Sequence, residues 1–330
     1  MRHILHYRDH MMKKILQFMA LMALAFAATA QPYPSKPVRL VVGFNPGGPT
    51  DQVARVVAEE LSKKLGQPFV VENRAGGNGA IAAQTVIASP ADGYTLLVGT
   101  SGALTVNPVM FKSMPYSPQK DLAPVAMLAA YPYALVVPVS LPVNDVKSLV
   151  EYVKKNPGKV SFSSAGPGSV NHLAGEWFKD IAKVDIVHVP YKGDAPALTD
   201  LIAGRVEMGF NTLTTSIPQV KGGKLKALAV TSPKPTSLAP GLTTMVDLGY
   251  RDFVVEPWNG LFGPANLPAD VANRLNQAVN EVLAQPRVQA QIAETGQYVL
   301  MDSPAGIRKR METQTERWRE IARAANLQPE

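Results

Sequence analysis

Short apolar runs alternate with amphipathic segments of helical period along most of the chain from residue 38 onward. Residues 38–44 are apolar almost throughout, which is typical of a strand buried on both faces of a parallel sheet. Residues 53–65 then carry valine and leucine at helical spacing, and Gly66 ends the predicted helix. Because the alternation continues to residue 100, this segment predicts a βαβαβ unit with a mostly parallel sheet.

A second alternating set lies between residues 134 and 231, and two long amphipathic helices close the sequence after residue 269. The chain therefore predicts an α/β fold with two lobes, each built on a mostly parallel sheet flanked by helices. Crossings near residues 131–137 and 255–262 would form a hinge between the lobes. The predicted parts are a leader at 1–30, a first lobe at 31–132 and 257–330, and a second lobe at 133–256.

The first thirty residues have the pattern of a secretory signal peptide. Two lysines precede an apolar run at residues 15–27, and an A-x-A cleavage motif ends at Ala30. The apolar run is too short to span a bilayer, which takes about 20 residues. The basic region begins only after Met11 and Met12, so we expect translation to start at one of them. The sequence thus predicts a periplasmic protein whose leader is cleaved near Ala30.

Composition excludes several classes of function. The chain has no cysteine, which removes disulfides, thiolate metal sites, a cysteine nucleophile and a lipid anchor. After the leader only His172 and His188 remain, without companions at metal-ligand spacing, and we expect His172 to be structural rather than a general base. No nucleotide-binding or hydrolase motif occurs, so neither a cofactor nor a metal is expected. The basic residues are scattered without an aromatic platform, which argues against nucleic acid.

Two glycine-bearing loops, at residues 45–51 and 164–169, each follow an apolar strand and open a helix. Such loops present backbone N–H groups at the positive end of a helix, where an anion can bind. In open α/β sheets the ligand crevice lies beyond the carboxyl ends of the strands, where both loops begin. They could also be tight turns that bind nothing. The functional interpretation is a receptor that closes over a small carboxylate.

Further polar residues are expected at the same edge. Thr100 and Ser101 offer hydroxyls, whereas Lys192 could meet a second ligand charge or be a solvated surface lysine. Asn211 could hydrogen-bond a ligand or a local turn, and Trp258 could wall the cleft or pack in the core. The predicted ligand-binding residues are Phe44, Pro46, Gly47, Gly48, Thr50, Asp51, Thr100, Ser101, Ala165, Gly166, Gly168, Ser169, Tyr191, Lys192, Asn211 and Trp258.

Six motifs spread over nearly the whole mature chain resemble one protein family. They are YPSKPVR at 33–39, PGGPTD at 46–51, ENRAGG at 72–77, ADGYTL at 91–96, VPYKG at 189–193 and WNGLFGP at 258–264. The chain thereby resembles the Bug-type substrate-binding proteins of tripartite tricarboxylate transporters. The resemblance implies a two-lobed periplasmic-binding-protein fold, type II-like, that hands its ligand to a membrane permease. It also implies that Phe44, residues 46–48, Thr50 and residues 165–169 hold a ligand carboxylate.

One departure bears on the ligand. Many members of that family have Phe-Asp where this chain has Phe210 and Asn211, which removes a carboxylate that could face a ligand ammonium. Amino-acid ligands are therefore less expected. The predicted partners are a small carboxylate and permease subunits, with the receptor itself a monomer. The alternatives are a secreted hydrolase on the same scaffold and a binding protein that feeds a sensor.

Overall fold

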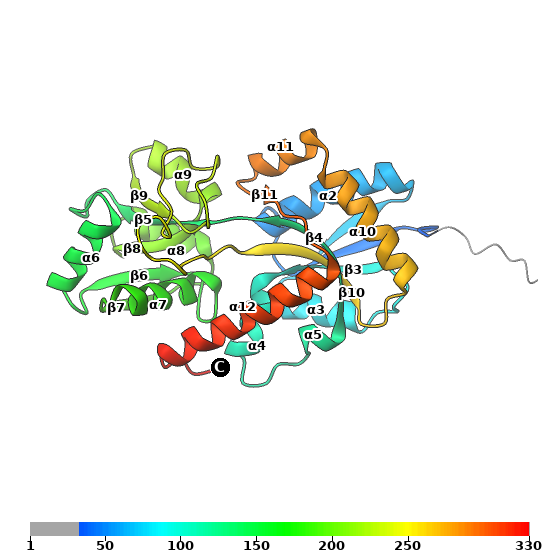
Figure 1. The fold of residues 1–330 in the computed structure, drawn as a ribbon, viewed down its shortest axis with the longest axis horizontal. Helices are drawn as coiled ribbons and strands as arrows, with labels where there is room; N and C mark the ends of the chain where they lie inside the picture. Colours follow the sequence, from blue (N-terminus) through cyan, green and yellow to red (C-terminus); the bar gives the residue numbers. More distant parts are fainter. Residues whose placement is uncertain (1–32, 330) are drawn as a thin grey trace, which may run out of the picture. The chain divides into compact units, whose positions relative to one another are not determined.

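The first sheet combines strands from both ends of the chain in the computed structural model, which describes residues 33–329. Its strand order is β11-β4-β10-β3-β1-β2 (Figure 1). β1 pairs in parallel with β2 and β3, while β10 runs antiparallel to β3 and β4. The strands are β1 (Val38–Val42), β2 (Phe69–Asn73), β3 (Thr95–Thr100), β4 (Leu122–Ala130), β10 (Trp258–Pro264) and β11 (Tyr298–Val299).

The second sheet has the order β7-β6-β8-β5-β9. β6 pairs in parallel with β7 and β8, and β5 runs antiparallel to β8 and β9. Two sheets flanked by helices confirm the predicted α/β fold, but both sheets are mixed rather than mostly parallel. The strands are β5 (Tyr133–Pro138), β6 (Val160–Ser164), β7 (Ile186–Pro190), β8 (Met208–Thr212) and β9 (Leu225–Val230).

The antiparallel pairs arise where the chain passes between the sheets. β4 of the first sheet leads directly into β5 of the second, and the chain returns after β9 to form β10. The two passages touch, because the amide of Tyr131 donates to the carbonyl of Pro257 at 3.0 Å. The division into lobes at 132/133 and 256/257 and the hinge remain predictions. The predicted leader, its start and its cleavage near Ala30 lie outside the described residues.

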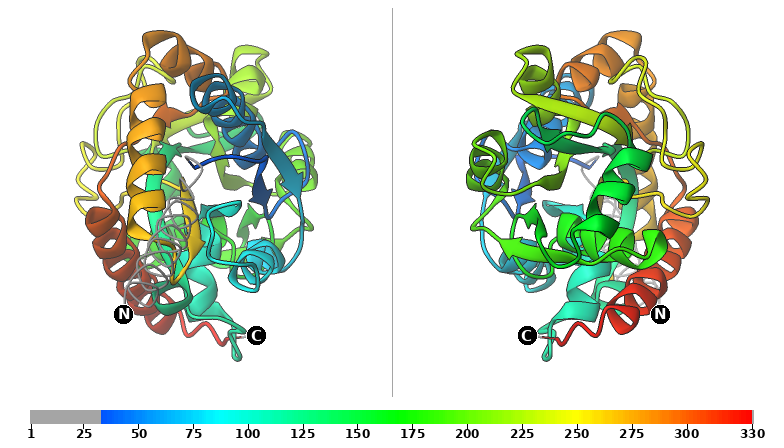
Figure 2. Two further views of the ribbon diagram at one scale, coloured as in Figure 1. Left: turned by 90° about the vertical axis from the view of Figure 1, so that its right-hand side faces the viewer. Right: turned by 90° about the vertical axis from the view of Figure 1, so that its left-hand side faces the viewer.

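Helices cover the faces of both sheets (Figures 1 and 2). In the first helix after β1, successive turns bury Val53, Val57 and Leu61, and Gly66 ends the helix in a left-handed conformation. The longer helices are α2 (Pro49–Leu65), α3 (Ala80–Ile87), α6 (Val146–Lys155), α7 (Val170–Ala182), α8 (Asp194–Ile202), α9 (Leu213–Lys221), α10 (Ala269–Leu283), α11 (Pro286–Glu294) and α12 (Pro304–Ala324). Shorter turns are η1 (Gly77–Gly79), η2 (Gly102–Val106), α4 (Asn107–Met110) and α5 (Pro118–Asp121).

Helix α12 packs against the cores of both sheets. Ile307 and Met311 belong to a buried cluster that includes residues of β1, β3, β4 and β10. Trp318 belongs to the cluster under the second sheet, where it meets the indole of Trp177 edge-on with ring centroids 6.3 Å apart. Helix α12 therefore packs against the buried residues of both sheets.

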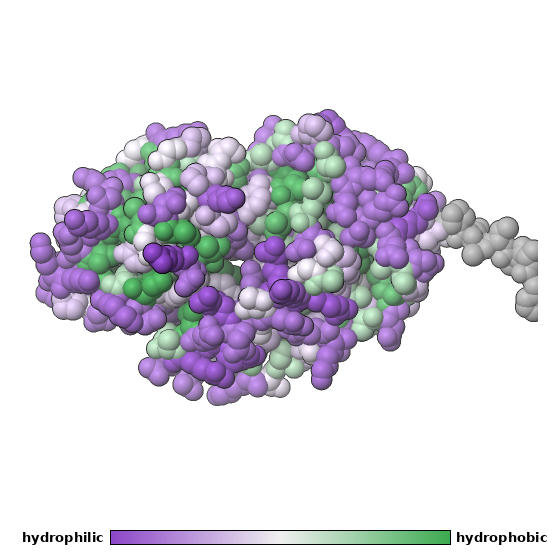
Figure 3. Space-filling view, viewed as in Figure 1, coloured by the Kyte–Doolittle hydropathy of each residue, from purple (hydrophilic) through white to green (hydrophobic). Residues whose placement is uncertain are grey.

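Few large apolar side chains are exposed among the described residues. Val70, Val139 and Met301 are half-exposed, and the face in Figure 3 shows apolar patches scattered within a mostly hydrophilic surface. Among the described residues, no helix combines the length and the apolar character that crossing a membrane requires.

Candidate functional site

A cavity of about 420 Å³ is lined by residues of both sheets and their connecting loops. Its volume lies within the range of small-molecule sites, about 300–1,000 Å³. The first sheet and its loops contribute Phe44, Asn45, Pro46, Gly48, Pro49, Thr50, Asn78, Thr100, Ser101 and Gly102, and the second contributes Tyr133, Ala165, Ser169, Val170, Asn171, Asp194, Ala195 and Thr212. Tyr131 and Pro257, from the two crossings, complete the lining.

Helices α2, α7, α8 and α9 all begin at this cavity. Thr50 lies in the first turn of α2, Asn171 in that of α7 and Asp194 in that of α8, while Thr212 is the N-cap of α9. Ser169 caps α7, but in the described part of the chain no side chain caps α2, α8 or α9. Uncapped N-termini leave backbone N–H groups free and each carries about half a positive charge. The cavity is therefore suited to an anion.

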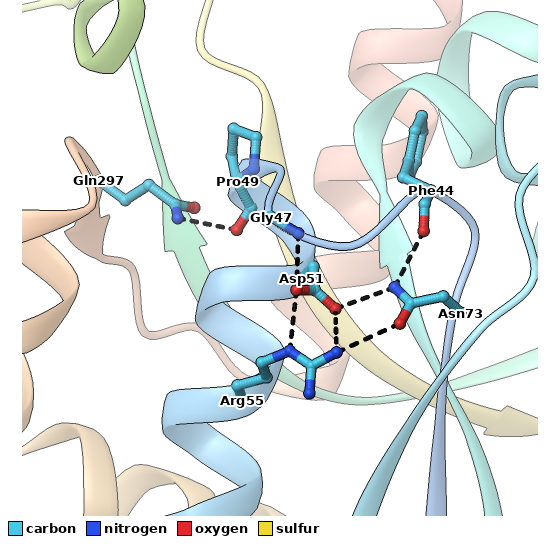
Figure 4. Close-up of polar contacts among 7 residues, drawn as sticks. All are labelled: Phe44, Gly47, Pro49, Asp51, Arg55, Asn73 and Gln297. Atoms are coloured by element: carbon cyan, nitrogen blue, oxygen red, sulfur yellow. Dashed lines mark hydrogen bonds and ion pairs between the residues drawn. The ribbon is translucent and has the colours of Figure 1, made fainter.

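The first glycine loop is held from behind by a buried carboxylate (Figure 4). Asp51 is 2% exposed and accepts hydrogen bonds from the amide of Gly47, the guanidinium of Arg55 and the amide of Asn73, at 2.9–3.0 Å. Burial alone would raise the pKa of Asp51, but these hydrogen bonds outweigh it and hold the pKa below its usual value. Asn73 also donates to the carbonyl of Phe44 at 3.0 Å. Asp51 thus fixes the loop rather than facing a ligand.

Gln297, the residue before strand β11, supports the same loop. Its amide donates to the carbonyl of Pro49 at 2.9 Å, as Figure 4 shows. It also donates to the hydroxyl of Thr295, whose carbonyl accepts from Thr214 of α9 at 2.6 Å. The first loop and the start of α9 are therefore linked through neighbouring residues of one segment, Thr295 and Gln297.

The second glycine loop is held by its own side chains and by a histidine. The hydroxyl of Ser169 donates to the carbonyl of Gly166 at 2.6 Å, so it shapes the loop instead of offering a proton to a ligand. The amide of Gly168 donates to Nδ1 of His172 at 3.1 Å. His172 stacks on His188, with ring centroids 3.8 Å apart. His172 thus supports the second glycine loop through the amide of Gly168 and packs against His188.

Eight predicted ligand-binding residues line the cavity, namely Phe44, Pro46, Gly48, Thr50, Thr100, Ser101, Ala165 and Ser169. The lining drawn from the described residues does not include Gly47, Asp51, Gly166 or Gly168, which shape the two loops. Whether any of these residues binds a ligand remains a prediction.

Two of the predicted ligand-binding residues, Trp258 and Asn211, are buried in the protein and are not part of the described cavity lining. Trp258 is 1% exposed and its indole donates to Gln314 at 2.7 Å, so it packs in the core instead of walling the cavity. Asn211 is 2% exposed. Its Oδ1 packs so close to Gly209 that a Cβ added there would lie only 2.6 Å away. Because successive strand residues face opposite sides, it is the next residue, Thr212, that reaches the cavity.

The loop after β7 contributes a different residue from the predicted one. Tyr191 donates its hydroxyl to Asp200 at 2.9 Å, and Lys192 is exposed. Within the described residues neither belongs to the lining, whereas Asp194 does. Sequence reasoning missed Asp194, although it opens a helix directly after a glycine, which is the same signal that marked the two glycine loops.

The lining is rich in polar groups but poor in charge. Of the described residues that line it, none is lysine, arginine or histidine, and Asp194 is the acidic one. Within residues 33–329, no group of three or more metal-ligating side chains is placed to hold an ion. Sequence reasoning did not identify Asn78, Tyr131, Tyr133 or Asn171 as lining residues, and they come from three separate segments.

Comparison with known proteins identifies the family. Residues 53–327 match the tripartite tricarboxylate transporter family receptor. Protein BugT of Bordetella pertussis is 35% identical over 307 residues, which cover 93% of this chain and 94% of BugT. The structure of R. palustris Rpa4515 with adipate has a TM-score of 0.82 at 36% identity, covering 90% of this chain and 100% of that one. MatC from Rhodopseudomonas palustris with bound malate has a TM-score of 0.76 at 32% identity, covering 88% and 99%.

The chain therefore belongs to the tripartite tricarboxylate transporter receptor family, and the predicted resemblance to Bug-type proteins is confirmed. The two-sheet α/β fold is confirmed as well. The family consists of receptors, and the two neighbouring structures hold adipate and malate.

Proposed function

We propose that this receptor captures a small carboxylate in the cavity, closes around it and delivers it to permease subunits of a tripartite tricarboxylate-type transporter. The observation that best supports the proposal is the convergence of the uncapped N-termini of α2, α8 and α9 on one cavity. Free N–H groups and the helix dipoles favour a carboxylate there. The adipate and malate found in two family structures support the same ligand class.

The energetics suit such a site without a cationic side chain. A hydrogen bond to a charged group contributes about 1.5–3 kcal/mol net, and a helix terminus about 0.3–1 kcal/mol. Three or four such contacts together with some apolar burial reach the ~8 kcal/mol of micromolar binding. Micromolar affinity is therefore attainable from backbone amides, hydroxyls and amide side chains.

The same proposal includes the organisation of the chain. The first lobe comprises residues 31–132 and 257–330, and the second comprises residues 133–256, with closure at the two crossings. The leader is cleaved near Ala30 and the mature monomer works in the periplasm, which the signal-peptide pattern supports. Because α12 packs on both cores, closure at the crossings would have to preserve or shift its contacts with the second core.

A hydrolase on this scaffold would need an accessible nucleophile beside a base. Within the described residues, Ser164 and His188 form one such pair, with Oγ 2.6 Å from Nε2. Ser164 is fully buried, however, and neither residue belongs to the cavity lining of the described chain. His188 is also stacked between Phe162 and His172. This pair fits a structural hydrogen bond, and the hydrolase is not favoured.

Gly48→Asp is expected to weaken binding of succinate and adipate at least tenfold while the protein stays folded. Gly48 is the uncapped N-cap of α2, has an extended backbone and leaves space for a Cβ, whose nearest neighbour would be 3.8 Å away. An aspartate there would cap the helix, which stabilises it, and would occupy the amides that a ligand carboxylate needs. Titration calorimetry measures the affinity, and Gly48→Ala is the matched control that should retain it.

Thermal unfolding provides the second readout. A ligand at 100 times its Kd adds about 2.7 kcal/mol of stability, which raises Tm by roughly 5 °C. The wild type and Gly48→Ala should show this shift, whereas Gly48→Asp should show little at the same concentration. Equal affinity in all three proteins would remove the N-terminus of α2 from the site. A receptor that feeds a sensor would bind equally well, but its deletion would leave uptake of the ligand intact.

A further inference from the structure

Asp194 places a carboxyl group in a cavity that otherwise favours anions. It is the first residue of α8 and follows Gly193, whose φ of 109° turns the chain sharply into the helix. Water in the cavity reaches Asp194, although protein atoms surround its carboxyl group. Of the described lining residues, none supplies a cationic side chain to pair with it.

The Asp194 carboxyl group is held in place by the second glycine loop. The side-chain amide of Asn171 donates to Oδ1 of Asp194 at 3.0 Å, and Oδ1 of Asn171 accepts from the amide of Ala165 at 3.2 Å. Both Asn171 and Ala165 line the cavity as well. Within residues 33–329, the other oxygen, Oδ2, receives no hydrogen bond from the protein. One oxygen is thus anchored and the other is left for a donor.

The charge of Asp194 contributes to raised pKa values of Tyr131 and Tyr133, two tyrosines of the lining. Burial, and after it the charge of Asp194, raises the pKa of Tyr131. Burial raises the pKa of Tyr133 in the same way, with smaller contributions from Tyr131 and Asp194. Burial also raises the pKa of Asp194, and the hydrogen bond from Asn171 offsets only part of it. The ionised carboxyl group is therefore short of stabilising partners.

We propose that Asp194 makes this receptor select carboxylates that also carry a hydrogen-bond donor, an ammonium or a hydroxyl group, which binds Oδ2. This inference rests on the proposed function, since the helix N-termini are taken to hold the ligand carboxylate. Amino-acid ligands were less expected because Asn211 stands where relatives have an aspartate. The position of Asn211 in the structure removes that argument. The side chain of Asn211 is buried in the second sheet, so an aspartate at that position would not be required to bind an ammonium.

A simpler role for Asp194 is to stabilise α8, because acidic residues favour the first turn of a helix. That role predicts a loss of stability on substitution but no change in the order of ligands. Selectivity therefore separates the two roles. Asp270, in the first turn of α10 and exposed, offers a matched control away from the cavity.

The test compares ligands that differ only in the donor. Titration calorimetry at pH 7.5 would use succinate, malate and aspartate, and the six-carbon pair adipate and 2-aminoadipate. The wild type and Asp270→Asn should bind the donor-bearing member of a series about tenfold more tightly than the plain diacid. Asp194→Asn should lose that preference, because it weakens binding of the donor-bearing acids and relieves repulsion of the plain diacid.

Each other result has a definite meaning. Equal binding of plain and donor-bearing acids by the wild type would overturn the selectivity while leaving carboxylate capture intact. A uniform loss across the series in Asp194→Asn would assign the residue to loop and helix stability alone, and would also overturn the inference. Absence of binding in both series would overturn the proposed function together with it.

Discussion

Lowering the pH from 8 to 5 is expected to reduce the free energy of unfolding by about 4 kcal/mol through His172 and His188 alone. Both rings pack against Phe162 of the second sheet, with Phe162, His188 and His172 stacked in sequence. Burial lowers the pKa of His172 to about 4. Burial, and then the neighbouring His172, lowers the pKa of His188 to about 3. The folded protein therefore keeps both rings neutral at pH 5.

The direction follows from where the protons bind. A histidine in the unfolded chain has a pKa of about 6.5. Below that pH the unfolded chain therefore binds two protons that the folded chain does not bind. Stability is fully present above pH 6.5 and falls as the pH drops toward the folded values. At pH 5 the difference is about 1.5 pH units for each ring, or about 2 kcal/mol each.

Acids whose pKa is raised act in the opposite direction. Burial raises the pKa of Glu176, whose Oε1 lies 4.0 Å from Nε2 of His172, and burial also raises the pKa of Asp194 and Glu256. These groups bind protons in the folded state first, which offsets part of the loss as the pH falls. The histidine contribution is therefore best measured as a difference between two proteins.

His188→Phe is the informative variant, because it keeps an aromatic ring against Phe162 and removes one titrating group. Urea unfolding at pH 8, 7, 6 and 5 should show a fall in stability that is smaller than in the wild type by about 2 kcal/mol at pH 5. The variant will be less stable at pH 8, since Ser164 loses a hydrogen-bond partner. An identical pH profile in both proteins would mean that His188 is protonated in the folded state.

The sequence was informative where structure is determined locally. The alternation of apolar runs and helical periods predicts the strand and helix order, because a buried strand followed by an amphipathic helix has few other solutions. The two glycine loops reach the cavity for the same reason, since both follow strands and open helices. The strand directions of β4, β5 and β10 could not be predicted this way, because they depend on how the chain passes between the sheets.

Side-chain orientation was the other limit. Asn211 and Thr212 are neighbours, yet only Thr212 faces the cavity, and a one-residue difference in strand register reverses such an assignment. Trp258 lies at the start of β10 beside the crossing, but its ring fills the core. The surroundings of Asp194 could not be predicted, since Asn171 and the tyrosines of the crossing that lie around it are distant in sequence.

The buried carboxylate behind the first loop shows how such distant contacts control a site. Oδ2 of Asp51 accepts a hydrogen bond from the amide of Gly47, and both carboxylate oxygens of Asp51 accept hydrogen bonds from Arg55, as Figure 4 shows. Gly47 has a φ of 88°, a left-handed conformation that favours glycine. The hydrogen bond from the Gly47 amide to Asp51 therefore helps to stabilise this loop conformation.

Asp51→Ala is accordingly expected to lower the free energy of unfolding by about 2–3 kcal/mol and to weaken carboxylate binding more than tenfold. The loss comes mainly from the amide groups of Gly47 and Asn73, which lose a buried acceptor, because the side chain of Arg55 is 55% exposed and regains water. Urea unfolding and calorimetric titration measure the two effects.

Two further variants separate the charge from the hydrogen bonds. Asp51→Asn has nearly the same shape, but its NH₂ group must face at least one donor among Gly47, Arg55 and Asn73, so it should lose affinity almost as strongly as Asp51→Ala. Arg55→Ala keeps the acceptor for Gly47 and should cost at most about 1 kcal/mol, with binding nearly unchanged. Should Arg55→Ala instead match Asp51→Ala in both measurements, the ion pair rather than the Gly47 contact would be what positions the loop.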